Sequence, residues 1–128
     1  MTNIPAELAY TEEHEWVQDL SEDSTYRVGI TDHAQNELGE VVFVQLPQVG
    51  DTTTAGDVVG EIESTKSVSD LFAPVSGEIV AVNEDLEDNP GLLNEDPYQA
   101  GWLFTVRVDS AEATAQLLDA QAYKQLID

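Results

Sequence analysis

Short runs of apolar and β-branched residues, separated by turn residues, occupy most of the chain from Tyr10 to Val82. These runs are too short and too frequent for a helical protein, and alternation within them places apolar side chains on one face of each strand. The pattern predicts an antiparallel β body over about residues 10–108. Its strands are expected at residues 14–18, 26–30, 41–46, 57–64, 67–71, 77–83 and 102–108.

Two helices are predicted beside these strands. In the segment ITDHAQNELGE, Thr31 or Asp32 can cap the first turn, and Gly39 can supply the left-handed residue that ends a helix of two turns. Near the C-terminus, Ser110 can cap the run AEATAQLLDAQAYKQLID, which is rich in helix formers and carries an apolar face. A helical segment is therefore expected over about residues 110–127, with a break near Asp119.

The segment EDLEDNPGLLNEDPY separates the last two predicted strands. It contains two prolines, one glycine and six acidic residues, a composition typical of a surface loop. Long loops in compact domains are often functional. With 128 residues and no linker between β segments, residues 1–128 are expected to form one domain around one core.

The charge balance is unusual, with 26 acidic residues against 4 basic ones and a net charge of −22. Such a surface repels phosphate backbones and anionic lipid headgroups, so binding to nucleic acid or to a membrane surface is disfavoured. Two explanations of the acidity remain open. It can favour partners with basic docking faces, or it can serve solubility where salt screens the self-repulsion.

The chain has no cysteine, which excludes disulfides, thiol nucleophiles and zinc–thiolate sites. No segment approaches the ~20 apolar residues of a membrane span, and the start MTNIPAELAY lacks the pattern of a secretion signal.

Neither His14 nor His33 falls in a metal-ligand pattern, and Pro90 stands where a calcium loop needs glycine. We expect a cytoplasmic monomer without a metal site, in which Trp16 and Trp102 are core or rim aromatics.

Lys66 is the most informative residue, because it stands in Ser64-Thr65-Lys66-Ser67 between two β-like runs and so at an expected hairpin tip. It is one of only two lysines in the chain, and a lysine at a tip is open to modification by another enzyme. Catalytic amines are activated by burial or nearby positive charge, and an exposed tip among carboxylates offers neither. Position alone does not distinguish a modified lysine from an ordinary exposed one.

The successive blocks YTEEHEW, GITDHAQNELGEVVFVQLPQVGD, ESTKSVSDLFAPVSGEIVAVNEDLEDNP and LLNEDPYQAGW resemble those of the glycine cleavage H proteins, in order and at the family's spacing. Lipoyl and biotinyl domains of other systems are more distantly similar, but they usually carry Asp or Met before the lysine, where this chain has Thr65. The resemblance implies a mainly β fold of the lipoyl/biotinyl type, a sandwich or flattened barrel of two antiparallel sheets with short helices and a C-terminal helix.

The resemblance also implies a set of functional residues. Lys66 falls on the lysine that carries covalent lipoate. Glu63 and Gly77, three residues before and eleven after it, fall on positions associated with recognition by lipoate-attaching enzymes. Glu15 and Asp70 fall near the arm, where a carboxylate can pair with a protonated aminomethyl group. A turn glycine and ordinary solvated acids remain the alternative interpretations of these four residues.

The implied function is that of a carrier and not of an enzyme. A lipoyl-lysine arm would accept an aminomethyl group from the glycine decarboxylase (P protein), deliver it to the aminomethyltransferase (T protein) and be reoxidised by dihydrolipoyl dehydrogenase (L protein). Tethering raises the local concentration of the carried group.

Three alternative functions compete with this one. The first is a lipoyl donor or relay for other enzymes. A carboxylate-pair hydrolase lacks a distinctive pair of acids, and an unmodified interaction domain would leave Lys66 as a free amine.

Overall fold

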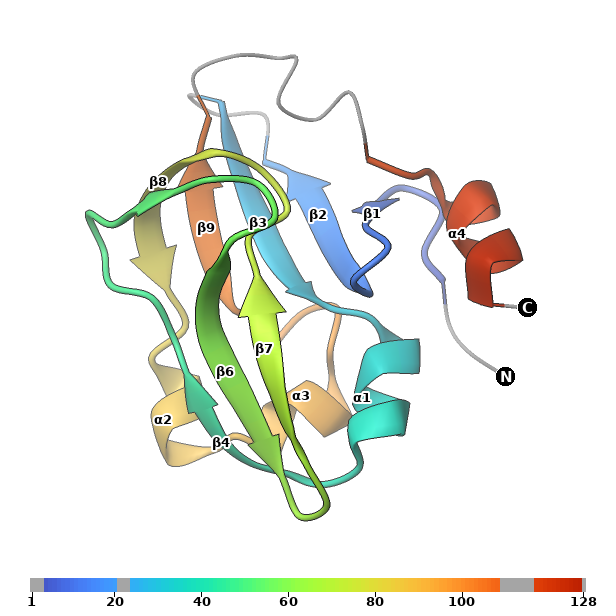
Figure 1. The fold of residues 1–128 in the computed structure, drawn as a ribbon, viewed down its shortest axis with the longest axis vertical. Helices are drawn as coiled ribbons and strands as arrows, with labels where there is room; N and C mark the ends of the chain where they lie inside the picture. The colour runs from blue at the N-terminus through green and yellow to red at the C-terminus, as the bar shows by residue number, and fades with distance from the viewer. Residues whose placement is uncertain (1–3, 21–23, 109–116, 128) are drawn as a thin grey trace.

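The computed structural model describes residues 4–20, 24–108 and 117–127, and its body consists of two antiparallel sheets (Figure 1). The larger sheet has the order β1-β2-β3-β9-β8-β5, with bounds Ala9–Tyr10, Glu15–Asp19, Thr25–Ile30, Phe104–Arg107, Gly77–Val82 and Thr52–Thr53. The smaller has the order β4-β6-β7, with bounds Val41–Gln45, Val58–Ser64 and Val68–Phe72. The predicted fold class is confirmed.

The core lies between the two sheets, because apolar residues from both contribute to one buried cluster. Val28, Ile79 and Phe104 come from the larger sheet and are completely buried. Ile62 and Leu71 come from the smaller one and are 2% and 1% exposed. The alternation of apolar and polar residues thus gives each strand one core-facing side, as predicted.

Each predicted strand is present, with ends that shift by a few residues. Two strands, β1 and β5, were not predicted, because two residues are too few to show an alternating pattern. The last strand begins at Phe104 instead of Trp102.

The ring of Trp102 packs under the Arg27 guanidinium, whose Cζ lies 4.7 Å from the ring centroid, so Trp102 is a rim aromatic as expected.

The first predicted helix is confirmed as α1 (Asp32–Leu38). Thr31 caps it by accepting a hydrogen bond from the Ala34 N–H at 3.1 Å, and Gly39 ends it with a φ of 81°.

The prediction of an irregular loop between the last two long strands was wrong in part. This segment forms two single-turn helices, α2 (Asp85–Asp88) and α3 (Leu92–Glu95). Each contributes one leucine to the core, Leu86 and Leu93, which are 1% and 0% exposed. Burial of these two apolar side chains outweighs the turn-forming composition around them.

The C-terminal helix α4 (Ala120–Ile127) begins directly after Asp119, where a break was expected, and forms the second part of the predicted segment. Residues 109–116, including the expected cap Ser110, lie outside the described residues, and Leu118 forms a single β-bridge with Tyr10. The buried ring of Tyr123 on α4 stacks on Tyr10 with centroids 4.8 Å apart. A second apolar cluster, which includes the buried Trp16, thereby attaches α4 to the edge of the larger sheet.

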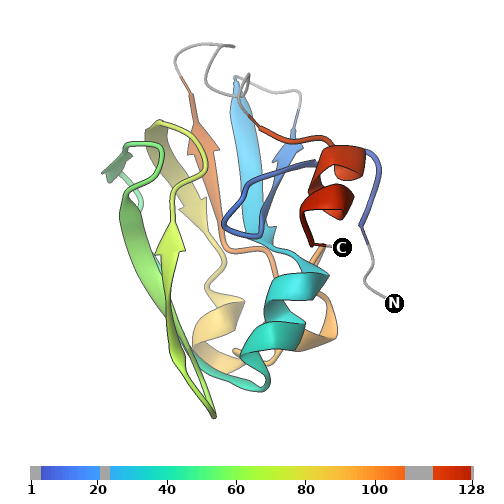
Figure 2. The ribbon, with the colours of Figure 1, turned by 45° about the vertical axis from the view of Figure 1, so that its right-hand side comes forward.

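The β6–β7 hairpin extends past the rest of the body at one end, beside α1 (Figures 1 and 2). Among the described residues there is no helix long and apolar enough to cross a membrane.

Candidate functional site

The tip of the β6–β7 hairpin is closed by the side chain and backbone of Ser64. The Ser64 N–H donates to the Ser67 carbonyl at 2.8 Å, and the Ser64 hydroxyl oxygen accepts from the N–H groups of Lys66 and Ser67 at 3.3 and 3.1 Å. The Thr65 N–H donates to the carbonyl of Glu40 at 3.0 Å. The tip is therefore held in one shape and tied to the residue that precedes β4.

Lys66 is exposed at this tip, as the sequence predicted. Its aliphatic stem lies against Gly39 at the end of α1, where an added Cβ would lie 3.3 Å from Cε of Lys66. Glycine at this position ends the helix and also leaves room for the lysine stem.

A cavity of about 280 Å³ opens beside the tip, between β7, α1 and the start of β2. Its floor is apolar and its rim carries carboxylates, so it can shelter a small cationic group from water. The structure brings the predicted residues Glu15 and Asp70 together in this cavity. Its lining consists of Glu13, His14, Glu15, Ile30, Ala34, Glu37, Leu38, Ile62, Ser67, Val68, Ser69, Asp70 and Leu71.

Glu15 is the most deeply placed acid of the cavity, with only 2% of its surface exposed. Its Oε2 accepts a hydrogen bond from the Phe72 N–H at 2.9 Å, and its Oε1 accepts one from the Thr11 hydroxyl at 3.3 Å. Burial raises the pKa of Glu15 to about 8, against the opposing effect of these two hydrogen bonds. Its alternative interpretation as an ordinary solvated acid is therefore wrong.

Asp70 lies on β7 at the open side of the cavity and is exposed. It stands directly opposite Glu61 of β6 in the smaller sheet. Neither acid has an ion-pair partner within residues 4–20, 24–108 and 117–127, so Asp70 is available to a cation that enters the cavity.

His14 lines the same cavity, although the sequence indicated only a capping or surface histidine. It adopts a left-handed backbone with a φ of 68°, and its Nδ1 lies 2.9 Å from the Tyr123 hydroxyl. Burial lowers the pKa of His14, and the His33 ring, 4.8 Å away between centroids, lowers it further. No local pattern indicates this contact, because Tyr123 lies 109 residues further along the chain.

The two positions that the resemblance associates with lipoylation lie at different ends of the molecule. Glu63 is on β6, close to the tip and directly opposite Val68. Gly77 begins β8 in the other sheet, at the end of the body opposite to the tip (Figure 1). An added Cβ at Gly77 would lie 2.2 Å from the Arg107 carbonyl oxygen, so close strand packing explains this glycine.

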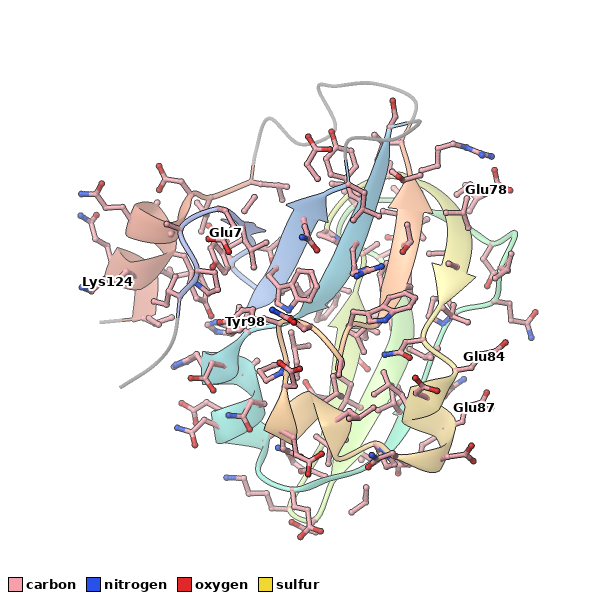
Figure 3. All side chains as sticks on the ribbon, turned by 180° about the vertical axis from the view of Figure 1, so that it is seen from behind. Glu7, Glu78, Glu84, Glu87, Tyr98 and Lys124 are labelled. Carbon is pink, nitrogen blue, oxygen red and sulfur yellow. The ribbon has the colours of Figure 1, made fainter. Side chains whose placement is uncertain are left out.

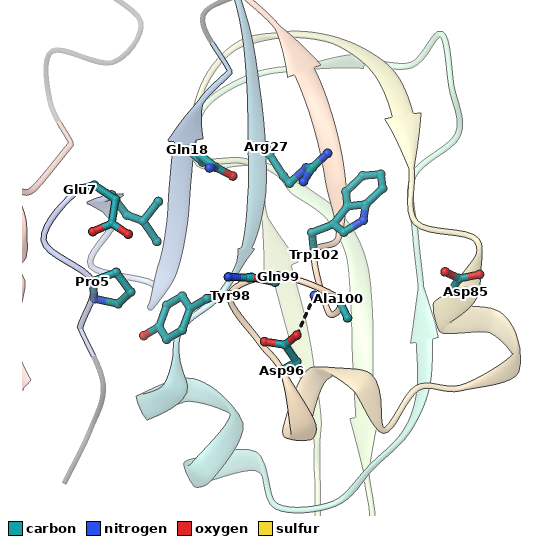
Figure 4. A pocket seen from close by; sticks show the side chains of 11 residues that line it. Pro5, Glu7, Gln18, Arg27, Asp85, Asp96, Tyr98, Gln99, Ala100 and Trp102 are labelled. Carbon is teal, nitrogen blue, oxygen red and sulfur yellow. Dashed lines mark hydrogen bonds between the residues drawn. The ribbon is translucent and has the colours of Figure 1, made fainter.

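A larger cavity, of about 750 Å³, lies on the outer face of the larger sheet (Figures 3 and 4). Arg27, Tyr98 and Trp102 surround it, and Asp96 at its edge accepts a hydrogen bond from the Ala100 N–H at 3.2 Å (Figure 4). It contains neither the tip lysine nor the acids Glu15 and Asp70. The smaller cavity at the tip is thus the candidate site.

Comparison with known proteins agrees with the geometry of the tip. A family model of the glycine cleavage H-protein matches residues 8–128. The chain belongs to the glycine cleavage H-protein family. An H protein of Kocuria rhizophila is 86% identical over 128 residues, covering 100% of both chains. An H protein of Mycobacterium bovis is 57% identical over 130 residues, covering 97% of this chain and 96% of the relative.

The fold agrees with a solved structure as well. The crystal structure of a glycine cleavage system H protein from Mycobacterium marinum superimposes with a TM-score of 0.87 at 48% identity, covering 95% of this chain and 97% of that one. As an H protein, the chain is a lipoyl carrier and not a catalyst, and it shuttles between the P, T and L proteins. H proteins carry lipoate covalently on a lysine, and the carrier role is supported over the relay role.

Proposed function

We propose that Lys66 is the lysine of this chain that carries lipoate, and that the cavity beside it shelters the aminomethyl group. The observation that supports this proposal most strongly is that an exposed tip lysine stands next to a cavity containing Glu15 and Asp70. The only other lysine, Lys124, lies on α4 away from the hairpin tip (Figure 3).

Attachment requires an amide bond at Lys66. The neutral Nζ attacks the carboxyl carbon of an activated lipoate, such as its adenylate. The new C–N bond forms as the C–O bond to phosphate breaks, AMP leaves, and the nitrogen releases one proton. The side chain of Lys66 is exposed at the hydrogen-bonded tip, which suits an amine that must enter the active site of another protein.

When bound, the lipoyl group would supply a dithiolane disulfide, one sulfur of which can take up the aminomethyl group as the S–S bond breaks. The chain's own residues would hold the protonated amine of that group. Asp70 meets it at the cavity mouth, and Glu15 meets it deeper in the wall. Because burial raises the pKa of Glu15 to about 8, approach of a cation favours ionisation of this carboxyl, with its proton passing to solvent. Ile30, Ile62 and Leu71 exclude water beneath them.

We assign the two lipoylation-associated positions different tasks. Glu63, near the tip, would contact the attaching enzyme directly. Gly77 would act by keeping β8 close to β9, since it lies at the opposite end of the body.

We also place the carrier in the cytoplasm, since a carrier works only in the compartment of its partners; cell fractionation tests this location.

Intact mass and peptide mapping of protein from a lipoylating host test the attachment site. The expected result is a single lipoyl group on Lys66, its loss in Lys66→Arg, and its retention in Lys124→Arg. Lys66→Arg should fold normally, since the side chain is exposed. A lipoyl group on Lys124, or an unmodified Lys66 beside an active ligase, would overturn the proposal.

A further inference from the structure

Strand β4 contains a bulge that turns a phenylalanine outward. Val41 pairs with Ser64 of β6, whereas Phe43, two residues on, pairs with the adjacent Glu63. As a result Val41 is 3% exposed and Phe43 is 50% exposed, although regular alternation would place both on the same face. Bulges that redirect a side chain are common beside functional sites.

Phe43 belongs to a row of three residues across the outer face of the smaller sheet. It stands opposite Glu63 on β6, which in turn stands opposite Val68 on β7, so the three side chains are direct neighbours. Val68 is 57% exposed. We call Phe43, Glu63 and Val68 the tip strip.

The tip strip places one carboxylate between two apolar side chains. Glu63 has no ion-pair partner among the residues that the structure describes. A complementary surface would carry a basic side chain surrounded by apolar ones, and a net charge of −22 favours the approach of such a partner.

The strip lies next to Lys66. Glu63 is three residues before the lysine and directly precedes Ser64, whose side chain closes the turn that carries Lys66. The Thr65 N–H, bonded to the Glu40 carbonyl, fixes the tip relative to the start of β4. The sheet that carries the strip lies in front in Figure 1.

We propose that the tip strip docks the enzyme that attaches lipoate to Lys66, and that Phe43 is its principal apolar contact. This inference rests on the proposed attachment site. The attaching enzyme acts on Nζ itself and must therefore enclose the hairpin tip. The P, T and L proteins act at the far end of the finished arm, so they can work without contacting Phe43, although Val68 at the end of the strip also lines the tip cavity.

Other exposed apolar residues provide matched controls. Val49 is 62% exposed between β4 and β5, and Leu126 is 48% exposed on α4. Neither belongs to the tip strip, so replacing them tests whether any loss of surface apolarity has the same effect.

The experiment uses the full chain as unmodified protein with a lipoate ligase, ATP and lipoate, and measures the rate at which lipoyl protein forms. Phe43→Ser should lower kcat/KM at least about tenfold, as expected for a central interface residue. Phe43→Leu should restore most of the rate. Val49→Ser and Leu126→Ser should match the unchanged chain. Each variant is first shown to keep its unfolding midpoint.

A second measurement uses the same variants after complete lipoylation. Their turnover by dihydrolipoyl dehydrogenase should stay within about twofold of the unchanged chain, since this enzyme acts on the arm. Equal loss with ligase and dehydrogenase, equal loss in Phe43→Ser and Val49→Ser, or a full ligase rate in Phe43→Ser would each overturn the docking inference while leaving Lys66 as the attachment site. Failure of the unchanged chain to accept lipoate at Lys66 would instead overturn the proposed function.

Discussion

Oε2 of Glu15 lies 2.9 Å from the backbone nitrogen of Phe72 and accepts its hydrogen bond. This contact joins β2 of the larger sheet to the end of β7 in the smaller sheet, at the wall of the tip cavity. A nearly buried acid thus has two tasks, one in holding the sheets together and one in facing the cavity.

Glu15 should make the stability of the protein fall as pH rises. Its pKa is about 8 in the fold and near 4.5 when solvated, so between these values the folded state binds more protons than the unfolded state. Stability from this group is therefore fully present below about pH 4.5 and is lost as pH rises toward 8. Glu15→Gln keeps an acceptor for the Phe72 N–H and cannot ionise.

Urea unfolding at pH 5 and pH 8 measures this effect. From pH 5 to pH 8, the unfolding free energy of the unchanged chain should fall by on the order of 3 kcal/mol more than that of Glu15→Gln. Glu61→Gln, at a partly buried acid on the outer face of the smaller sheet, serves as the control for lost negative charge. Parallel pH profiles for Glu15→Gln and the unchanged chain would show that Glu15 is not held neutral by the fold.

Glu15 and Asp70 should protect the carried aminomethyl group to different extents. Glu15 is buried in the cavity wall and Asp70 is exposed at its mouth, and a charge-assisted contact is stronger away from water. After loading, Glu15→Gln should shorten the lifetime of the aminomethyl group by about tenfold or more, and Asp70→Asn by less. Release of formaldehyde over time gives the lifetimes; a larger effect of Asp70→Asn would contradict this ranking.

The sequence was sufficient for the seven longer strands, the first helix and the hairpin tip, because these depend on local alternation, a capping threonine and turn residues. It did not show that Glu15 is buried, since that depends on Phe72, which is 57 residues away. The outward position of Phe43 depends on a bulge that leaves no mark in the run VVFVQ. Long-range packing thus decided the features that local pattern could not show.

Gly77→Ala should destabilise the fold through packing. A Cβ at this position would lie 2.2 Å from the Arg107 carbonyl oxygen and 2.9 Å from Cγ2 of Val106, so β8 and β9 would have to separate. We expect a loss of about 2 kcal/mol, typical of overpacking in a core. Gly91→Ala is the matched control, because the nearest atom there would be 3.6 Å away.

Denaturant unfolding and a lipoylation assay distinguish the two interpretations of Gly77. If this glycine acts by packing, Gly77→Ala should lower the unfolding free energy, while the molecules that remain folded accept lipoate at a normal rate. A strong loss of lipoylation with unchanged stability would instead favour direct recognition of Gly77 by the attaching enzyme.

Tyr123→Phe should loosen the attachment of α4. The Tyr123 hydroxyl lies 2.9 Å from Nδ1 of His14 and 2.8 Å from the Thr31 hydroxyl, and it bridges α4 to the turn before β2 and to the cap of α1. Phenylalanine would keep the stacking on Tyr10 and remove both hydrogen bonds, at a cost of about 1–3 kcal/mol.

Hydrogen exchange and urea unfolding together measure this change. Amides of α4 should exchange faster in Tyr123→Phe, and the unfolding free energy should fall. Tyr26→Phe is the control, because the Tyr26 hydroxyl has no hydrogen-bond partner in the described part of the chain. Since His14 lines the tip cavity, the aminomethyl lifetime should also shorten in Tyr123→Phe. A lower stability with an unchanged lifetime would show that α4 supports the fold without positioning the wall of the cavity.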